Sequence, residues 1–250
     1  MMSSWANVEP LIRIVYGVVI LYFVLGGVGF YAINRNKSPE TARKSYTKFF
    51  TYFIIVNFLF LCIVLKPEFF KYIAVLLTTI GMWELCRLFY LSGYEHKSFF
   101  VISIGLFILL GTGFYGFSRL PYHQILYTFL IVAIFDSFSQ ITGQLWGRKK
   151  ILPSVSPHKT LGGVTGGIVI AFISSFLLSD LYEISIGVRV FLVVGIIGFA
   201  FAGDILASLY KRKYGVKDYS RLIPGHGGVL DRFDSLIVSG AWVAVYNLYF

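Results

Sequence analysis

The chain has 250 residues and a formal net charge of +10, but 57% of its residues are hydrophobic and only 14% are charged. Soluble domains usually contain about a quarter charged residues, so this composition excludes an ordinary soluble protein. Uncharged apolar runs recur along the chain, for example at 14–33 and 99–118. A helix needs roughly 20 mainly apolar residues to cross a bilayer. The sequence therefore predicts a protein that crosses the membrane several times.

The apolar runs predict an all-α fold, a polytopic membrane bundle of about eight transmembrane helices. Seven or nine helices are alternatives, because the second and eighth segments are short. The first segment is too long for the core of a signal peptide and has no small-residue cleavage site after it, so we expect it to be retained. Cys62 and Cys86 lie within apolar segments, which argues against a disulfide. In chain order the predicted helices span residues 12–33, 49–65, 69–91, 99–118, 122–142, 161–179, 188–210 and 235–250.

No linker of domain size separates these helices, so we expect a single membrane domain, 1–250. Residues 1–135 form an apolar helical half, and residues 136–250 carry the motifs described below. Small residues let membrane helices approach closely. They recur in the sixth helix at Gly162, Gly163, Gly166 and Gly167, and in the seventh at Gly195, Gly198 and Gly203. Most of these glycines are therefore expected to serve helix packing.

The basic residues are unevenly distributed over the connections. The first, third, fifth and seventh connections hold 16 of the 22 Lys and Arg residues. Positively charged short loops stay in the cytosol, so these four connections should be cytosolic and both termini should lie outside. The net charge of +10 then reflects topology and nearby anionic headgroups or phosphates, and nucleic acid is not an expected partner.

Three acidic residues fall inside apolar helices, where ionised groups are costly and usually face a cavity or a partner. They are Glu84, Asp136 and Asp204, each in the predicted cytosolic third of its helix. Glu84 has an alternative role, neutralisation by Arg87 three residues later. Asp136 lies four residues before Gln140 and has the alternative of a hydrogen-bonded helix pair. The shared depth of the three carboxylates predicts a cytosol-facing polar pocket within the membrane.

The seventh helix carries the strongest candidate face. Asp204, Ser208, Lys211 and Arg212 share one side of a helix with 3.6 residues per turn. This face offers a carboxylate, a hydroxyl and two cations from the membrane towards the cytosol. These groups could hold a metal ion and phosphate oxygens.

The segment 211–235 concentrates charge and turn residues. Residues 224–228 read Pro-Gly-His-Gly-Gly, a turn whose backbone amides could face an anion. Asp231 and Asp234 are three residues apart, so both carboxylates can point the same way, as Mg²⁺ coordination with phosphates would require. His226 could be a base or a structural turn residue. The segment carries cations suited to polyphosphate at Lys211, Arg212, Lys213, Lys217, Arg221 and Arg232, although several could serve topology alone.

A second basic loop precedes the sixth helix. Ser156, Lys159 and Thr160 supply hydrogen-bond donors there, and the helix that follows would direct the positive end of its dipole at a bound anion. Two basic, glycine-containing loops thus flank the carboxylates. The residues indicate a Mg²⁺-dependent enzyme that acts on a phosphorylated or polyphosphate substrate.

The same residues form a long motif. It runs through Ser208-Leu-Tyr-Lys-Arg212, Lys217-Asp218 and Leu222-Ile-Pro-Gly-His-Gly-Gly-Val-Leu-Asp-Arg-Phe-Asp234. This pattern resembles the signature of the phosphatidate cytidylyltransferases, also called CDP-diacylglycerol synthases. Gly203-Asp204 and Ser156-Pro-x-Lys-Thr160 match the family as well, and Asp136 with Gly143 and Gly147-Arg148 matches more loosely. The resemblance covers about residues 136–235.

The chain departs from the family pattern at three places near the second loop. His158 stands where the family usually has Lys, and Leu161-Gly162 stands where Trp-Glu is common. Ser137-Phe-Ser-Gln140 replaces the usual stretch after the aspartate. These differences concern the inner contacts of that loop and the acceptor lipid.

The resemblance implies that CTP condenses with phosphatidic acid to give CDP-diacylglycerol and pyrophosphate in phospholipid biosynthesis. It assigns Asp204, Asp231 and Asp234 to Mg²⁺, with a monovalent cation such as K⁺ nearby. Lys211 and Arg212 complete the catalytic set, and Asp136 and Glu84 have no assigned role. Nucleotide and phosphate contacts are expected from Ser156, Lys159, Ser208, Lys217, Asp218, His226, Gly227, Gly228 and Arg232.

The expected partners are CTP, phosphatidic acid and membrane lipids, and a homodimer is compatible with this reading. The expected location is the membrane, with the active site on the cytosolic side. The short chain favours a bacterial host and its inner membrane. One alternative is a CTP-dependent kinase of a polyprenol or other lipid, and a weaker one is a transporter or scaffold without enzymatic activity.

Overall fold

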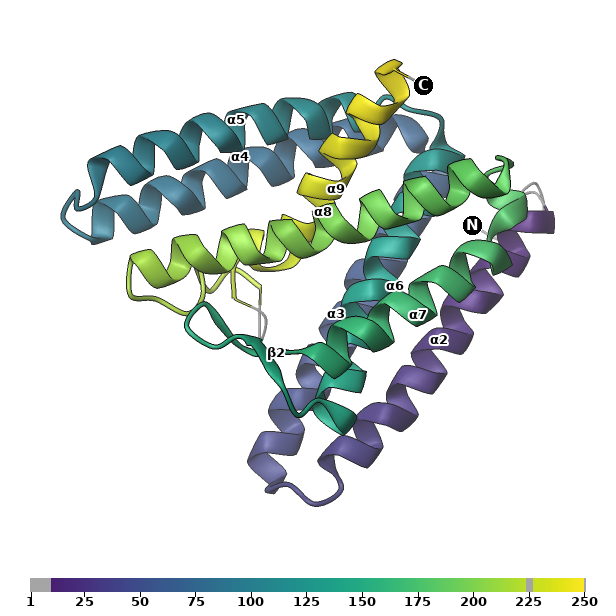
Figure 1. The fold of residues 1–250 in the computed structure, drawn as a ribbon, viewed down its shortest axis with the longest axis horizontal. Coiled ribbons are helices and arrows are strands. Elements are labelled where there is room, and N and C mark those ends of the chain that lie inside the picture. The colour runs from purple at the N-terminus through teal and green to yellow at the C-terminus, as the bar shows by residue number, and fades with distance from the viewer. Residues whose placement is uncertain (1–9, 224–226, 250) are drawn as a thin grey trace.

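The structure, a computed structural model, describes residues 10–223 and 227–249, and its described part is almost entirely helical (Figure 1). Six of its helices are long and apolar enough to cross a membrane. The expectation of an all-α polytopic membrane protein is therefore confirmed. The helices are α2 (Pro10–Asn34), α3 (Pro39–Leu65), α4 (Pro67–Leu91), α5 (Lys97–Phe117), α6 (Tyr122–Trp146), α7 (Leu161–Leu177), α8 (Ile186–Lys213) and α9 (Leu230–Tyr249), and α7 and α9 are not among the six.

Helix α3 begins ten residues earlier than the apolar run predicts. Its first residues are charged, so hydropathy does not mark them. The start signal is local: Ser38 is the N-cap, Pro39 is the first helical residue and Glu40 lies in the first turn. Proline is preorganised for the first helical position, and an acidic side chain there complements the helix dipole. These early turns place Lys48 on the helix rather than in a loop.

The two helices that bound the charged segment 211–235 are also longer than predicted. Helix α8 continues through Lys211 and Arg212 to Lys213, which puts three cations in its last turn, where the helix dipole favours them. Helix α9 begins at Leu230, so Asp231 and Asp234 lie within its first two turns. The connection between these helices is therefore limited to residues 214–229, and Tyr219 within it contacts Ala207 on α8 and Asp231 on α9.

The segment between α6 and α7, predicted as a loop, contains a short antiparallel hairpin. Strand β1 (Lys150–Leu152) pairs with β2 (Ser156–Thr160). Thr160 then caps α7, because its hydroxyl accepts a hydrogen bond from the amide of Gly163 at 3.1 Å. The guanidinium Nε of Arg212 donates to the carbonyl of Val155 at 3.1 Å. The hairpin is therefore fixed both to α7 and to the end of α8.

Glycines set the closest helix contacts, as the sequence predicts. A Cβ atom added at Gly163 would lie 2.6 Å from the carbonyl oxygen of Ser139 on α6. A Cβ atom at Gly203 on α8 would lie 2.7 Å from the carbonyl oxygen of Asp234 on α9. Only glycine permits such backbone approaches. The Gly203 contact brings α9 against α8 directly beside Asp204.

The helices place the charged connections together. In Figure 1 the hairpin and the α8–α9 connection lie at the lower left, and the free ends of α2 and α9 lie towards the upper right. Helix α6 lies in the interior, with an almost unbroken buried stretch from Ile125 to Phe135. This arrangement leaves the polar ends of α6, α8 and α9 facing one another.

Candidate functional site

A polar cavity of about 390 Å³ lies between α3, α6, α8, α9 and the hairpin. It brings together most of the residues that the sequence singles out. Gly227, Gly228 and Glu84 are described residues that do not line it, and His226 lies outside the described residues. The predicted residues that do line it are Asp136, Ser156, Lys159, Ser208, Asp204, Lys211, Arg212, Lys217, Asp218, Asp231, Arg232 and Asp234.

Asp204 is paired with a cation from the hairpin. The ammonium of Lys159 lies 2.6 Å from Asp204 Oδ2 and 4.4 Å from the centre of the Phe201 ring. The hydroxyl of Ser208, one turn along α8, donates to Asp204 Oδ1 at 3.3 Å. The side chain of Asp204 remains 35% exposed, so it is accessible from the cavity. The predicted face of α8 and the second basic loop therefore meet at this carboxylate.

Asp231 is held more tightly. Its Oδ1 accepts from Lys211 at 2.5 Å, and its Oδ2 accepts from the backbone amides of Tyr219 and Gly228, both at 2.8 Å. The Lys211 side chain is 11% exposed and that of Asp231 is 3% exposed. Both carboxylate oxygens of Asp231 thus have protein donors, and the residue links α8, α9 and the loop between them.

Asp136, Asp204 and Asp234 form a different group. They come from α6, α8 and α9, and all three line the polar cavity. The backbone amide of Ser235 donates to Asp234 Oδ1 at 2.8 Å. Three mutually repelling carboxylates around one cavity create a local need for positive charge, and Lys159 supplies part of it.

Among the described residues, no three His, Cys, Asp or Glu side chains are arranged as a ready metal-ligand set. Mg²⁺ does not need such a set, because it usually binds one or two carboxylates together with water and substrate phosphates. Asp204 and Asp234 offer hard oxygen atoms at the cavity and fit this requirement. Asp231 fits less well, because its side chain is 3% exposed, against 35% for Asp204, and two of its three hydrogen-bond donors are backbone amides of the loop.

Tyr219 supports the connection between α8 and α9 from inside. Burial raises the pKa of its phenol well above the ordinary value, with further contributions from the negative charges of Asp234 and Asp231. The hydroxyl therefore stays protonated, and it donates to the carbonyl of Ala207 at 3.1 Å. The Lys211 ammonium lies 5.3 Å from the centre of the same ring. Tyr219 thus positions the lysine without entering the cavity.

Glu84 does not pair with Arg87, so that alternative is wrong. Arg87 instead donates from Nη1 to the carbonyl of Tyr219 at 3.0 Å. Glu84 is fully buried and accepts hydrogen bonds from Ser220, Val229 and Leu230. The sequence gives no sign of these contacts, because the partners are at least 136 residues apart.

Several residues line the cavity without having been predicted, among them three with polar groups. Lys48 and Tyr52 come from α3, and Ser139 comes from α6. Among the described residues, the buried hydroxyl of Ser139 has no hydrogen-bond partner. The helix start at Pro39 is a signal that Lys48 lies on α3, but it does not indicate that the lysine lines the cavity. Ser139 belongs to the stretch where the chain departs from the family pattern.

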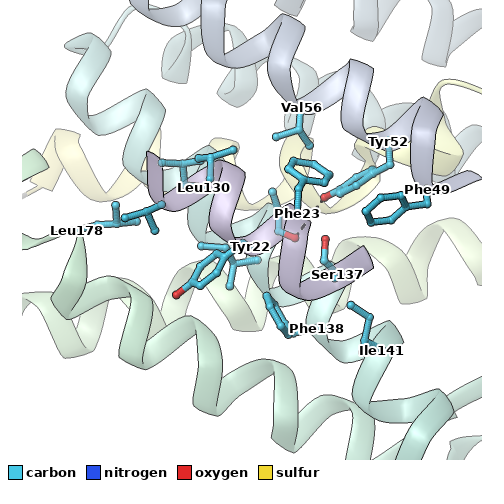
Figure 2. A pocket seen from close by; sticks show the side chains of 15 residues that line it. Tyr22, Phe23, Phe49, Tyr52, Val56, Leu130, Ser137, Phe138, Ile141 and Leu178 are labelled. Atoms are coloured by element: carbon cyan, nitrogen blue, oxygen red, sulfur yellow. Dashed lines mark hydrogen bonds between the residues drawn. The ribbon is translucent and has the colours of Figure 1, made fainter. Parts of the chain in front are cut away.

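An apolar cavity adjoins the polar one. It lies between α2, α3 and α6 and is shown in Figure 2, where Phe23, Phe49 and Phe138 surround it. Tyr52, Val56, Ala133 and Ser137 line both cavities. The Tyr52 hydroxyl donates to the carbonyl of Ala133 at 3.2 Å, so polar groups mark the boundary. A small apolar cavity, of about 70 Å³, therefore lies directly beside the polar one.

Comparison with known proteins agrees with this geometry. Phosphatidate cytidylyltransferases of Staphylococcus haemolyticus and Staphylococcus saprophyticus are each 40% identical to the chain, over 126 and 117 residues. These matches cover 50% and 46% of this chain, and 48% and 45% of the relatives. That of Staphylococcus epidermidis is 34% identical over 151 residues, 56% of this chain and 58% of the relative.

The chain thus spans about half the length of the curated relatives it matches. The family model of the cytidylyltransferases matches residues 121–250, slightly more than half of the chain. This segment contains α6 to α9 and the hairpin, and so all the carboxylates and cations of the polar cavity except Lys48. The chain belongs to the cytidylyltransferase family.

Proposed function

We propose that this protein is a phosphatidate cytidylyltransferase, which transfers a cytidylyl group from CTP to phosphatidic acid. The observation that carries the proposal is the polar cavity, in which carboxylates of three helices meet cations of α8, α9 and the hairpin. Such a site suits two polyanionic reactants. Relatives named phosphatidate cytidylyltransferase match the segment that builds it.

In the proposed reaction, a phosphate oxygen of the lipid attacks the α-phosphorus of CTP. A new P–O bond forms, the bond from the α-phosphorus to the bridging oxygen of the β-phosphate breaks, and pyrophosphate leaves. The main task of the protein is to hold two anions in line and to offset their charge. Lys211, Lys217 and Arg232 lie along the cavity and can neutralise the phosphates. No protein nucleophile is required.

Mg²⁺ would bind Asp204 and Asp234, with Asp136 nearby, and would neutralise phosphate oxygens. Asp231 would instead hold Lys211 and the loop amides, because it is buried and two of its donors are backbone amides. Lys159 would have to leave Asp204 Oδ2 if the metal took that oxygen. Lys159 would move to a phosphate and keep its charge in the site. A monovalent cation such as K⁺ is proposed as a second charge partner.

The apolar cavity of Figure 2 supports the lipid half of the proposal. A few methylene groups of an acyl chain placed there would leave the lipid phosphate at the boundary formed by Tyr52 and Ser137. CTP is proposed to enter from the opposite, cytosolic side, where the basic connections lie. In a bacterial host the protein would reside in the inner membrane.

A doubly labelled nucleotide tests the proposal. The purified full chain, in lipid nanodiscs with phosphatidic acid and Mg²⁺, should transfer label from α-³²P CTP into the lipid. Label from γ-³²P CTP should appear in pyrophosphate and not in the lipid. Omission of phosphatidic acid is the control. Transfer of the γ-label into lipid would show a CTP-dependent kinase instead, and absence of α-label transfer into the lipid would contradict the proposed function.

A further inference from the structure

Glu84 lies in a part of the chain that the family model does not match, yet it contacts the loop at the centre of the site. Its side chain is fully buried in α4. Among the described residues it has no ion pair. Its Oε1 accepts from the Ser220 hydroxyl at 2.6 Å and from the amide of Val229 at 2.9 Å, and its Oε2 accepts from the amide of Leu230 at 2.8 Å. All three neighbours are donors, so the carboxyl group acts purely as an acceptor.

These contacts place a carboxylate at the N-terminus of α9. The first amides of a helix have no partner within the helix, and a negative group there also complements the helix dipole. Capping groups usually come from the residue just before the helix. Here the acceptor comes from α4, and it holds the amides of Val229 and Leu230 together. The start of α9 is therefore fixed to a helix far away in the sequence.

Glu84 and Asp231 close the same loop from two sides. Glu84 joins Ser220, where the loop leaves Tyr219, to Val229 and Leu230, where the loop ends. Asp231 joins Tyr219 to Gly228 in the same manner. The two carboxylates thus join the beginning of this loop, at residues 219–220, to its end, at residues 228–230. The loop belongs to the segment that carries the family signature.

Gly228 shows how closely the loop fits. A Cβ atom added there would lie 2.8 Å from the carboxyl carbon of Glu84 and 2.9 Å from the Cβ atom of Tyr219. The carboxylate thus occupies the space where any larger residue would put its side chain. Glu84 and Tyr219 together therefore require glycine at this position.

We infer that Glu84 is a positioning residue, which orients α9 so that Asp231, Arg232 and Asp234 face Asp204 and Lys211 across the polar cavity. Glu84 does not line that cavity and acts only through the loop and α9. The inference rests on the proposed cytidylyltransferase activity. A displacement of about 1 Å in a site of this kind can cost about 10²-fold in rate. Loss of Glu84 should therefore lower turnover far more than it weakens nucleotide binding.

The test is Glu84→Gln in the full-length protein. The amide keeps the size of the side chain, but it removes the negative charge and turns one oxygen into a donor that faces the Leu230 amide. We expect kcat, per folded molecule, to fall about 10–100-fold, with a smaller change in the KM for CTP. Glu84→Asp, which keeps the charge, should recover part of the loss.

Arg189→Gln is the matched control. Arg189 is also a buried charged residue, and it donates to the carbonyls of Ser175, Tyr182 and Ile184. It lies fifteen residues before Asp204 on α8, or about 22 Å along the helix. This variant should lower the melting temperature and leave kcat per folded molecule unchanged.

Two outcomes would overturn the inference while the wild type still makes CDP-lipid. One is a kcat for Glu84→Gln within twofold of the wild type, with only a lower melting temperature, as in Arg189→Gln. The other is an unchanged kcat for Ser220→Ala, which is measured if Glu84→Gln does not fold. This variant removes a single donor to Glu84, and the inference predicts that its kcat falls about 3–10-fold. If the wild type itself makes no CDP-lipid, the proposed function fails instead.

Discussion

The ion pair between Lys211 and Asp231 is the tightest charged contact at the polar cavity, and both side chains are largely withdrawn from solvent. A buried charge that loses its partner is strongly destabilised, so such residues act as a pair. Asp231 has two further backbone donors, from Tyr219 and Gly228. A change at either residue should consequently disturb the loop as well as the charge of the site.

The carboxylates of α9 should therefore respond differently to Mg²⁺. Asp234→Asn should lower turnover about 10²–10³-fold and raise the Mg²⁺ concentration needed for half-maximal rate, because Asp234 is proposed to bind the metal. Asp231→Asn should lower turnover with little change in that Mg²⁺ requirement. Formation of CDP-lipid against Mg²⁺ concentration measures both effects. A larger shift in Mg²⁺ requirement for Asp231→Asn than for Asp234→Asn would reverse the assignment.

Lys211 and Lys44 provide a comparison at equal charge. Lys211→Ala should reduce CDP-lipid formation strongly, since it removes a cavity cation and leaves Asp231 without its ion pair. Lys44→Ala should have little effect, because Lys44 forms only an exposed pair with Glu40, four residues away on α3. Initial rates at saturating CTP compare the two. Equal and slight losses would mean that the basic residues near the cavity serve topology alone.

At this scale the sequence predicts which residues meet, but not how they pair. Asp204, Lys211 and Asp234 are marked by their charge in apolar surroundings, and all three line the cavity. The engagement of Asp231 by the amides of Tyr219 and Gly228 depends on the path of the loop, which no local pattern encodes.

At the scale of the helices, the site depends on how closely α8 and α9 approach. The contact occurs at Gly203, next to Asp204, where the carbonyl of Asp234 takes the space of a side chain. Because interiors are closely packed, even one methyl group must displace one helix from the other. The distance between the two carboxylates is thus set by a residue without a side chain.

Gly203→Ala should separate Asp204 from Asp234 and lower turnover, whereas Gly198→Ala on the same helix should be neutral. A Cβ atom at Gly203 would lie 2.7 Å from a backbone carbonyl oxygen, but a Cβ atom at Gly198 would meet nothing within 4 Å. The rate of CDP-lipid formation and the melting temperature should be measured together. Equal rates for the two variants would exclude control of the site by this contact.

The helices themselves are largely predictable from the apolar runs, and the differences lie at their charged ends. Helix α3 starts at Pro39 and α9 starts at Leu230, in both cases before the hydrophobic segment begins. Capping signals mark the first start, and the contact with Glu84 accounts for the second. Hydropathy identifies the part of a helix that lies in lipid, but it does not identify helical turns that extend into water or a polar cavity.

For the whole molecule, the distribution of Lys and Arg predicts one orientation in the membrane. Cysteines introduced at Lys44, Lys150 and Arg221, which are all exposed, should react with a membrane-impermeant maleimide only after the cytosolic face is opened. Cysteine at the exposed Asp180 should react in intact cells and serves as the control. Cys62 and Cys86 are free thiols and must first be replaced by serine. Labelling at Lys150 in intact cells would contradict the orientation.

The hydrogen bonds between Glu84 on α4 and the start of α9 have a consequence for biosynthesis. Leu230 follows Glu84 by 146 residues, so at about 5–20 residues per second the ribosome needs about 7–30 s to deliver the amide that completes this contact. During that interval the carboxyl group of Glu84 on α4 lacks the donors that it has in the folded protein. A chain that ends before Ser220 would keep this buried position without those donors, so α4 should insert less stably in such a truncated chain.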